Sequence, residues 1–189
     1  MLRKPIHLQA FLMACVVSLF AVAQAHAQCK PPANQKPPLS PAEQASIELG
    51  GKNVTIYYCA PSLKGRTVGD QVATFDKVWR TGANTSTTLH TDANLNIRGK
   101  VVPAGTYSLY TIPSRRGWVL IINKQTGQWG TVYNQQDDLY RIPMLDGIVA
   151  STPVEKFTIH FDNTKGNKTE LHLSWGKANV LVPVEATTM

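Results

Sequence analysis

Two histidines in the C-terminal third of the chain have the residue type that a metal site needs. His160 and His172 lie in two segments of alternating polar and apolar residues, separated by the turn-forming stretch 162–167. If these segments pair as a hairpin, both imidazoles and the carboxylate of Glu170 share one face. Imidazole suits Zn²⁺ and Cu²⁺. No H-x-H or H-E-x-x-H motif accompanies the pair, so the sequence favours the alternative, a solvated sheet face with charges paired across strands.

A polar segment, 64–84, contains the residues best suited to binding an organic ligand. Arg80 and Asn84 could bind a carboxylate or sugar hydroxyls, with Trp79 as a stacking surface. In the alternative, which general statistics favour, Arg80 hydrogen-bonds to backbone carbonyls of its own loop and Trp79 fills the end of the fold. The chain contains no G-x-S-x-G, P-loop or G-x-G-x-x-G motif, and we expect no cofactor.

The segments that would position these residues have the pattern of β-strands. Short runs rich in β-branched and aromatic residues alternate with turn-forming residues, and no amphipathic helix interrupts them. The predicted strands are 54–58, 95–98, 106–112, 118–122, 157–161, 171–175 and 180–184, with a weaker candidate at 141–150. This pattern predicts an all-β protein, a single-domain antiparallel β-sandwich of jelly-roll or immunoglobulin-like type with about eight strands. One helical turn could form over 69–77.

The first 27 residues have the organisation of an export signal. Arg3 and Lys4 precede a mainly apolar run, 8–23, which is followed by an A-x-A site ending at Ala27. The run is shorter than the ~20 residues that a membrane-spanning helix needs. We therefore expect cleavage after Ala27 and a periplasmic or extracellular protein.

Behind the signal, residues 28–41 are rich in proline, which predicts an extended spacer before a globular domain over 42–189. Hydrophobic residues make up 43% of the chain and charged residues 16%, which excludes a disordered, highly charged protein. The formal net charge of +7 comes from scattered basic residues, and the longest basic run is Arg115-Arg116. This distribution argues against nucleic acid as a partner and fits a mild attraction to anionic cell-envelope polymers.

Cleavage would leave two cysteines, Cys29 and Cys59. In an exported chain they could form a disulfide, which would stabilise the fold by about 3–4 kcal/mol through the loop that it closes. Two free thiols are the alternative, because the sequence gives no distance between them. A thioredoxin-like redox site is not indicated, since there is no C-x-x-C motif.

Several stretches, taken together in this order, resemble a known family. They are PSLKGR at 61–66, KVWRTGAN at 77–84, PAGTYSLYTIP at 103–113, the strand 118–124, LSW at 173–175 and VPV at 182–184. They resemble a secreted bacterial family known as domain of unknown function 2911, over roughly 39–184. The resemblance implies a signal-bearing, single-domain β protein of the cell envelope, and it implies no reaction.

The chain differs from this family's pattern at two positions. Thr85 stands where members often have a glutamate after Gly-Ala-Asn, and Gly176 stands where a glutamate frequently follows the closing Trp. If the family used either acid for catalysis or metal binding, this protein would be impaired.

Three functions therefore remain open at the level of sequence. The first is a non-catalytic cell-envelope module, structural or binding a small molecule, a glycan or another envelope protein. The second is a hydrolase-like enzyme with its site around Arg80 and Asn84. The third is a metal-binding protein that uses His160 and His172. Missing catalytic motifs favour the first.

Overall fold

The computed structural model of the chain describes residues 29, 40–148 and 151–187. The predicted cleavage site after Ala27 and most of the predicted spacer lie outside the described residues. In the described part, no helix is long and apolar enough to cross a membrane.

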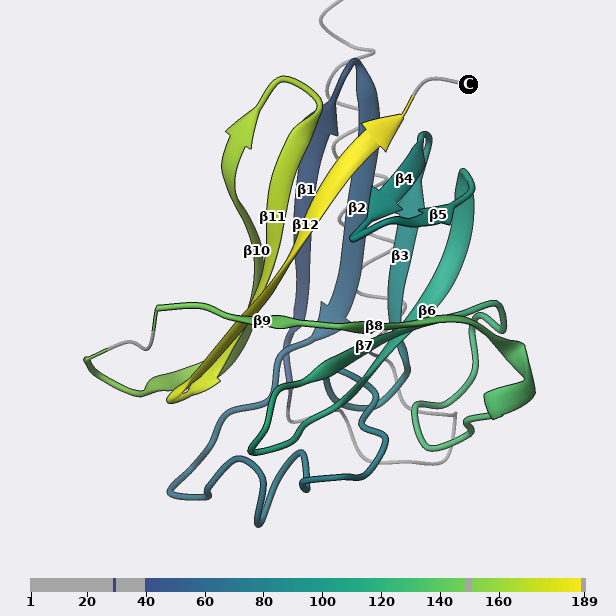
Figure 1. Cartoon of the computed structure of the whole chain (residues 1–189). Helices are drawn as coiled ribbons and strands as arrows, with labels where there is room; N and C mark the ends of the chain where they lie inside the picture. The colour runs from purple at the N-terminus through teal and green to yellow at the C-terminus, as the bar shows by residue number, and fades with distance from the viewer. Residues whose placement is uncertain (1–28, 30–39, 149–150, 188–189) are drawn as a thin grey trace, which may run out of the picture.

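Across the residues that the structure describes, twelve strands form two antiparallel sheets (Figure 1). The first sheet has the order β1-β2-β3-β6-β7-β8, and the second has the order β10-β11-β12-β4-β5, with β9 paired to β12. The strands are β1 (Ala42–Leu49), β2 (Lys52–Cys59), β3 (Thr87–Thr91), β4 (Asn94–Ile97), β5 (Lys100–Val102), β6 (Gly105–Ile112), β7 (Val119–Asn123), β8 (Asp138–Pro143), β9 (Leu145–Asp146), β10 (Val154–Lys165), β11 (Lys168–Gly176) and β12 (Ala178–Thr187). A 3-10 turn, Gln135–Asp137, precedes β8.

One hydrophobic core lies between the sheets. Alternate residues of β2, such as Val54 and Ile56, are buried in it, and so are Leu171, Leu173 and Trp175 of β11. This alternation follows from the period of two in a β-strand, which sends successive side chains to opposite faces. The prediction of an all-β antiparallel fold is thus confirmed.

The strand count differs from the prediction of about eight, for a physical reason. The edge strand β1 was not predicted. It buries Ala45 and Leu49 on one face, and most of its other residues are polar, so its sequence lacks a clear apolar alternation. Strand β3 is rich in threonine and only five residues long. The stretch 69–77 forms turns and bends, without the possible helical turn.

The hairpin of β10 and β11 has the pairing that the sequence predicted. His160 lies opposite His172, and Asp162 lies opposite Glu170. The turn is tighter than the predicted 162–167, because β10 continues to Lys165.

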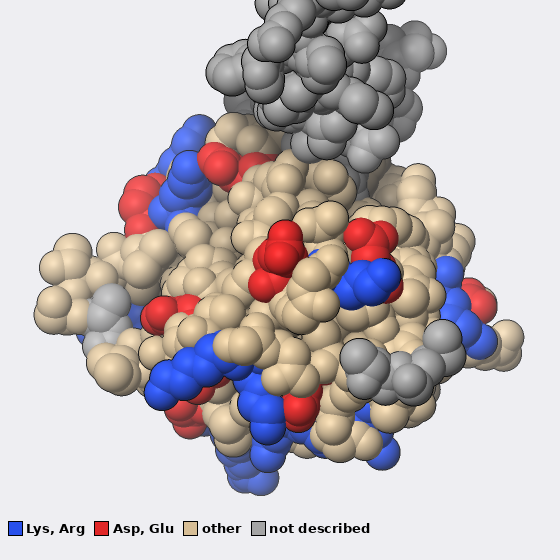
Figure 2. Space-filling view, turned by 90° about the horizontal axis from the view of Figure 1, so that it is seen from above, with Lys and Arg blue, Asp and Glu red and all other residues tan. Residues whose placement is uncertain are grey.

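The long connection between β2 and β3 lies at the lower end of the sandwich in Figure 1. The opposite end is seen from above in Figure 2, where acidic and basic side chains are interspersed. The two ends therefore differ, since one carries a long folded loop and the other carries hairpin turns.

Candidate functional site

The segment that carries the predicted ligand-binding residues extends the first sheet. Trp79 and Thr111 of β6 exchange two backbone hydrogen bonds, with N–O distances of 2.7 and 2.8 Å. Because side chains alternate along extended chain, Trp79 faces the core and Arg80 faces the opposite side of the sheet. The two residues therefore have different surroundings.

Trp79 belongs to an aromatic cluster at the end of the core. Its ring is stacked on Trp175, with centroids 5.4 Å apart and an angle of 15° between the planes. It also meets Trp118 and Phe157 edge to face, at 6.2 and 4.9 Å. This packing corresponds to the alternative in which Trp79 fills the end of the sandwich, and it occupies the ring face that a ligand would stack on.

Arg80 lies against a glycine from a distant loop. A β-carbon added at Gly130 would be only 2.0 Å from Cδ of Arg80 and 2.7 Å from the carbonyl oxygen of Asn84. Gly130 therefore permits the loop 124–134 to pack directly on the arginine. Arg80 and Gly130, with Val78, Trp79, Thr131 and Tyr133, line a hollow of about 340 Å³, which we call the Arg80 hollow.

The guanidinium of Arg80 has no hydrogen-bond acceptor among the described residues. Its Nε atom is buried without a partner. Burial lowers the pKa of Arg80, with the Tyr110 side chain acting weakly in the opposite direction. An arginine remains charged at neutral pH even so. The structure therefore holds a partly buried cation with one buried donor, Nε, that has no partner, and among the described residues the Arg80 side chain forms no bonds to the loop carbonyls.

Asn84 does not line the Arg80 hollow but contacts one of its lining residues, Gly130. Its φ of 60° places it in the left-handed region, which asparagine tolerates better than most residues. Its backbone oxygen accepts a hydrogen bond from the Gly130 amide at 3.0 Å, and its side-chain Nδ2 is buried without a partner. Asn84 thus connects the segment 64–84 to the loop 124–134. Its Nδ2 atom is a second buried donor without a partner among the described residues, after Nε of Arg80.

A second arginine, Arg141, forms a hydrogen-bonded cluster with Tyr133 and Asp138. Arg141 donates to Asp138 at 2.9 Å and to the Tyr133 hydroxyl at 2.8 Å, and that hydroxyl donates to Asp138 at 2.6 Å. Burial and the bond to Asp138 raise the pKa of Tyr133 to about 12. The hydrogen bond that Arg141 itself donates to Asp138 raises the pKa of Arg141. The carboxylate nearest to the hollow is therefore already engaged.

A buried polar network supports the hollow from the sheet side. Gln128 donates to Ser108 at 3.2 Å and to the Tyr110 hydroxyl at 2.9 Å, which in turn donates to the Val132 carbonyl at 3.1 Å. These bonds fix the loop 124–134 on the outer face of β6. Sequence reasoning missed this loop, Gly130 and Tyr133 included, although its Gly-Gln-Trp-Gly stretch is typical of a tight connection.

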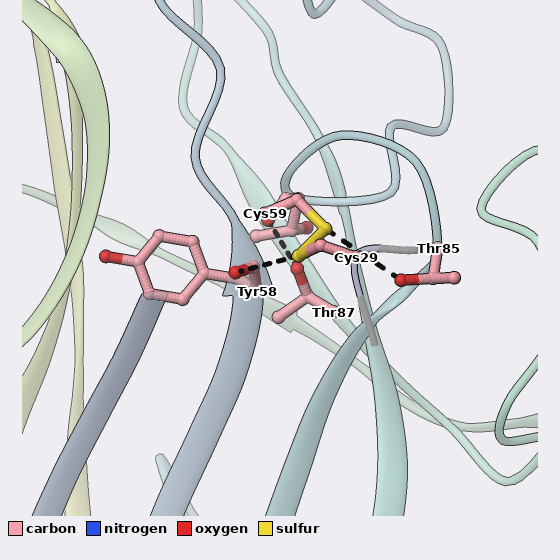
Figure 3. The surroundings of a disulfide bond; sticks show 6 residues. Cys29, Tyr58, Cys59, Thr85 and Thr87 are labelled. Carbon is pink, nitrogen blue, oxygen red and sulfur yellow. Dashed lines mark hydrogen bonds between the residues drawn. A yellow bond between two sulfur atoms is a disulfide. The ribbon is translucent and has the colours of Figure 1, made fainter. Parts of the chain in front are cut away.

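A disulfide joins Cys29 to Cys59 at the end of β2, with a Cα–Cα distance of 5.7 Å (Figure 3). The carbonyl oxygen of Cys59 accepts a hydrogen bond from the Ala83 amide at 3.0 Å. The Thr85 hydroxyl lies 4.0 Å from the Cys59 sulfur. The bridge is thus attached to the base of the segment that carries Arg80 and Asn84.

The histidine pair lies on the outer face of the second sheet. The rings of His160 and His172 are stacked, with centroids 4.9 Å apart. His172 is hydrogen-bonded to Glu170 at 3.0 Å, and the bonds of Glu170 to Asn163 and His172 lower the pKa of Glu170. Burial and the neighbouring His172 lower the pKa of His160.

No three His, Cys, Asp or Glu side chains in the described residues are arranged to hold a metal ion. The third histidine that could have joined the pair, His90, lies in β3 of the other sheet, 3.2 Å from Asp92. The structure therefore brings two imidazoles together without a set of ligands around one point.

Thr85 and Gly176, the two positions at which the resemblance led us to expect glutamate, have local structural roles. Thr85 forms an isolated β-bridge with Trp129, next to the Arg80 hollow. Gly176 ends β11 with a φ of 58°, in the tight connection to β12. A side chain at Gly176 would be strained, since this backbone conformation favours glycine.

The two packed antiparallel sheets define an all-β protein with the long β2–β3 connection at one end. A family model described as "protein of unknown function (DUF2911)" matches residues 40–184. The chain belongs to this family, as the sequence resemblance indicated. A comparison with curated proteins and a comparison with solved structures each gave no match.

Proposed function

We propose that the protein is an exported, non-catalytic binding module of the cell envelope that takes a small anionic ligand, such as a carboxylate, in the Arg80 hollow. The observation that carries this proposal is the Nε atom of Arg80, which is buried beside the Arg80 hollow without a partner among the described residues. A partly buried cation without an acceptor is costly, and an anion that supplies both charge and acceptors removes that cost. Bidentate carboxylate is the natural partner of a guanidinium.

The remaining lining supports binding more than catalysis. Thr131 offers a hydroxyl, and Tyr133 offers its ring, since its own hydroxyl is bonded to Asp138 and Arg141. With a pKa of about 12, the Tyr133 hydroxyl stays protonated at neutral pH and is a poor general base. The export part of the proposal depends on the N-terminal signal pattern alone.

The test compares benzoate with benzamide, which has the same shape without the charge. Benzoate should shift the ¹⁵N-NMR amide signals of Gly130 and Thr131, and benzamide should leave them in place. In Arg80→Met the benzoate response should disappear. The matched variant Arg116→Met, which removes an arginine from an exposed turn, should keep it.

An equal response to both compounds, or an undiminished response in Arg80→Met, would refute the proposal. Edman sequencing of exported protein that begins at Met1 instead of Gln28 would refute its signal-peptide component.

A further inference from the structure

A larger hollow lies at the same end of the sandwich and shares no lining residue with the Arg80 hollow. Its volume is about 540 Å³, within the range of small-molecule sites. We call it the end hollow. It is lined by Leu63, Arg66, Thr67, Val68, Phe75, Ser114, Trp118, Pro153, Gly176, Lys177 and Ala178. Apolar side chains dominate this lining, and none of its described residues is acidic.

The apolar walls are held in place before any ligand binds. The Phe75 ring lies directly on Gly69, where an added β-carbon would come within 2.1 Å of it. The guanidinium of Arg115 lies over the same ring, 5.0 Å from its centroid. Trp118 is buried and meets Trp79 edge to face. A rigid wall binds with less loss of conformational entropy than a mobile one.

Two cations stand among these apolar residues. Arg66 donates to the carbonyl oxygens of Leu63 and Ser62, at 2.9 and 2.8 Å, which fixes its guanidinium beside the end hollow. Lys177 is exposed in the tight turn between β11 and β12. Neither forms an ion pair within the described part of the chain.

Acidic groups near the end hollow do not neutralise these cations. Glu155 accepts a hydrogen bond from the Lys64 amide at 2.8 Å, which directs it to that turn. Asp76 lines an adjoining, smaller depression that shares Phe75 and Ser114 with the end hollow, and two arginines, Arg115 and Arg116, line that depression with it. The end hollow thus combines an apolar interior with uncompensated positive charge.

From this combination we infer that the end hollow binds a small amphiphile with one apolar body and one anionic group. The apolar body would lie against Leu63, Phe75 and Trp118, and its anionic group would lie between Arg66 and Lys177. Burial of an apolar ligand surface supplies most of the affinity, and the cations select the charged head.

The test uses two fluorescent dyes that differ mainly in charge. 1-Anilinonaphthalene-8-sulfonate carries a sulfonate, and N-phenyl-1-naphthylamine has the same rings without it. The intact exported protein should bind the sulfonate dye with one-to-one stoichiometry. The double variant Arg66→Gln, Lys177→Gln should weaken that binding about tenfold and leave the neutral dye's affinity unchanged.

Matched controls separate the site from general surface effects. Lys124→Gln with Lys165→Gln removes the same charge from exposed positions elsewhere and should not change either titration. Thr67→Trp places a large ring in the end hollow from an exposed position and should abolish binding of both dyes. Thr126→Trp, on an exposed loop, should abolish neither.

Several results would overturn the inference. The first is that the intact protein does not bind the sulfonate dye with one-to-one stoichiometry. The second is that both charge-removing double variants lose the same affinity for this dye. The third is that Arg66→Gln, Lys177→Gln weakens the binding of both dyes equally. NMR locates the dye independently of the Arg80 proposal. Shifts at Val68, Gly176 and Lys177 are expected, and shifts confined to Gly130 and Thr131 would place the dye in the Arg80 hollow.

Discussion

Arg80 and Arg141 both lie close to Tyr133 and have opposite surroundings. Arg141 is partly exposed, with 38% of its side chain accessible, and it bonds to a carboxylate and a phenol. Arg80 is more enclosed and has no acceptor among the described residues. Desolvation lowers the pKa of Arg80, whereas the bond to Asp138 raises that of Arg141.

On the proposed function, this difference separates an arginine that stabilises the fold from an arginine that binds a ligand. The Arg141 cluster is complete in the unliganded state, so its residues serve the fold. In the Arg80 hollow the Nε atom of Arg80 is buried without a partner among the described residues, which supports the proposal that this arginine binds a group from outside the chain. Replacing the arginine should therefore lower the free energy of unfolding at Arg141 and raise it at Arg80.

The largest effect should come from removing the disulfide. The double variant Cys29→Ala, Cys59→Ala should lose about 3–4 kcal/mol of unfolding free energy, since the closed loop no longer restricts the unfolded chain. Urea denaturation measures this loss. Because the Cys59 carbonyl binds the Ala83 amide, hydrogen exchange should accelerate more at Ala83 than at the Arg141 cluster. Equal denaturation midpoints for the variant and the parent would contradict the prediction.

A substitution at Gly130 should disturb the packing around Arg80 and leave the Arg141 cluster unchanged. Gly130→Ala should cost about 2–3 kcal/mol, because the new methyl group overlaps Arg80 and the Asn84 carbonyl. Adding Arg80→Ala should recover part of the loss, since one of the two overlaps disappears. Thermal unfolding of the two single variants and the double variant measures the coupling. Strictly additive losses would show that Gly130 does not pack on Arg80.

The two arginines should respond oppositely to the same substitution. Arg141→Met should destabilise the protein by about 1 kcal/mol, since it removes a partly exposed ion pair from Asp138. Arg80→Met should stabilise the unliganded protein by about 1 kcal/mol, because an apolar side chain replaces an enclosed charge without a partner. Equilibrium urea denaturation at neutral pH compares the two. Destabilisation by Arg80→Met would instead indicate an arginine that ties its loop.

The local patterns in the sequence were sufficient for the fold and for part of the site. Alternation over 157–161 and 171–175 predicted the β10–β11 hairpin and the contact of His160 with His172, because adjacent strands need only a short turn to pair. The polar segment around Arg80 was also recognised, since its residue types contrast with the strands on both sides.

The contacts that complete the site could not be predicted, because they join distant segments. Gly130 meets Asn84 across 46 positions of the chain, and its significance is the absence of a side chain. Trp79 was considered as a stacking surface, and only the position of Trp175 in three dimensions reveals that its ring is covered. Strand β1 was missed because its exposed polar face obscures its alternation.

The smallest expected effect concerns the two stacked histidines, His160 and His172. As with the two arginines, one side chain of the pair is hydrogen-bonded among the described residues and the other is not. His172 is bonded to Glu170, and its other ring nitrogen lies 3.4 Å from Asn179. His160 has no hydrogen-bond partner for its ring in the described part of the chain and stacks on His172. Burial and His172 lower the pKa of His160 below its ordinary 6.5, and Asp162 opposes this only weakly.

The lowered pKa of His160 makes the free energy of unfolding decrease as the pH falls. Between the ordinary pKa of 6.5 and the lower folded value, the unfolded chain binds more protons at His160 than the folded chain does. The contribution of His160 to stability is therefore present above pH 6.5 and is lost as the pH falls through this window. The lowered pKa of Glu170 acts only below its ordinary 4.5, outside the window. Calorimetry of the parent and of His160→Asn at pH 7.5 and 5.5 should give a smaller decrease in melting temperature for the variant, and equal decreases would mean that the stacked pair accepts a proton without cost.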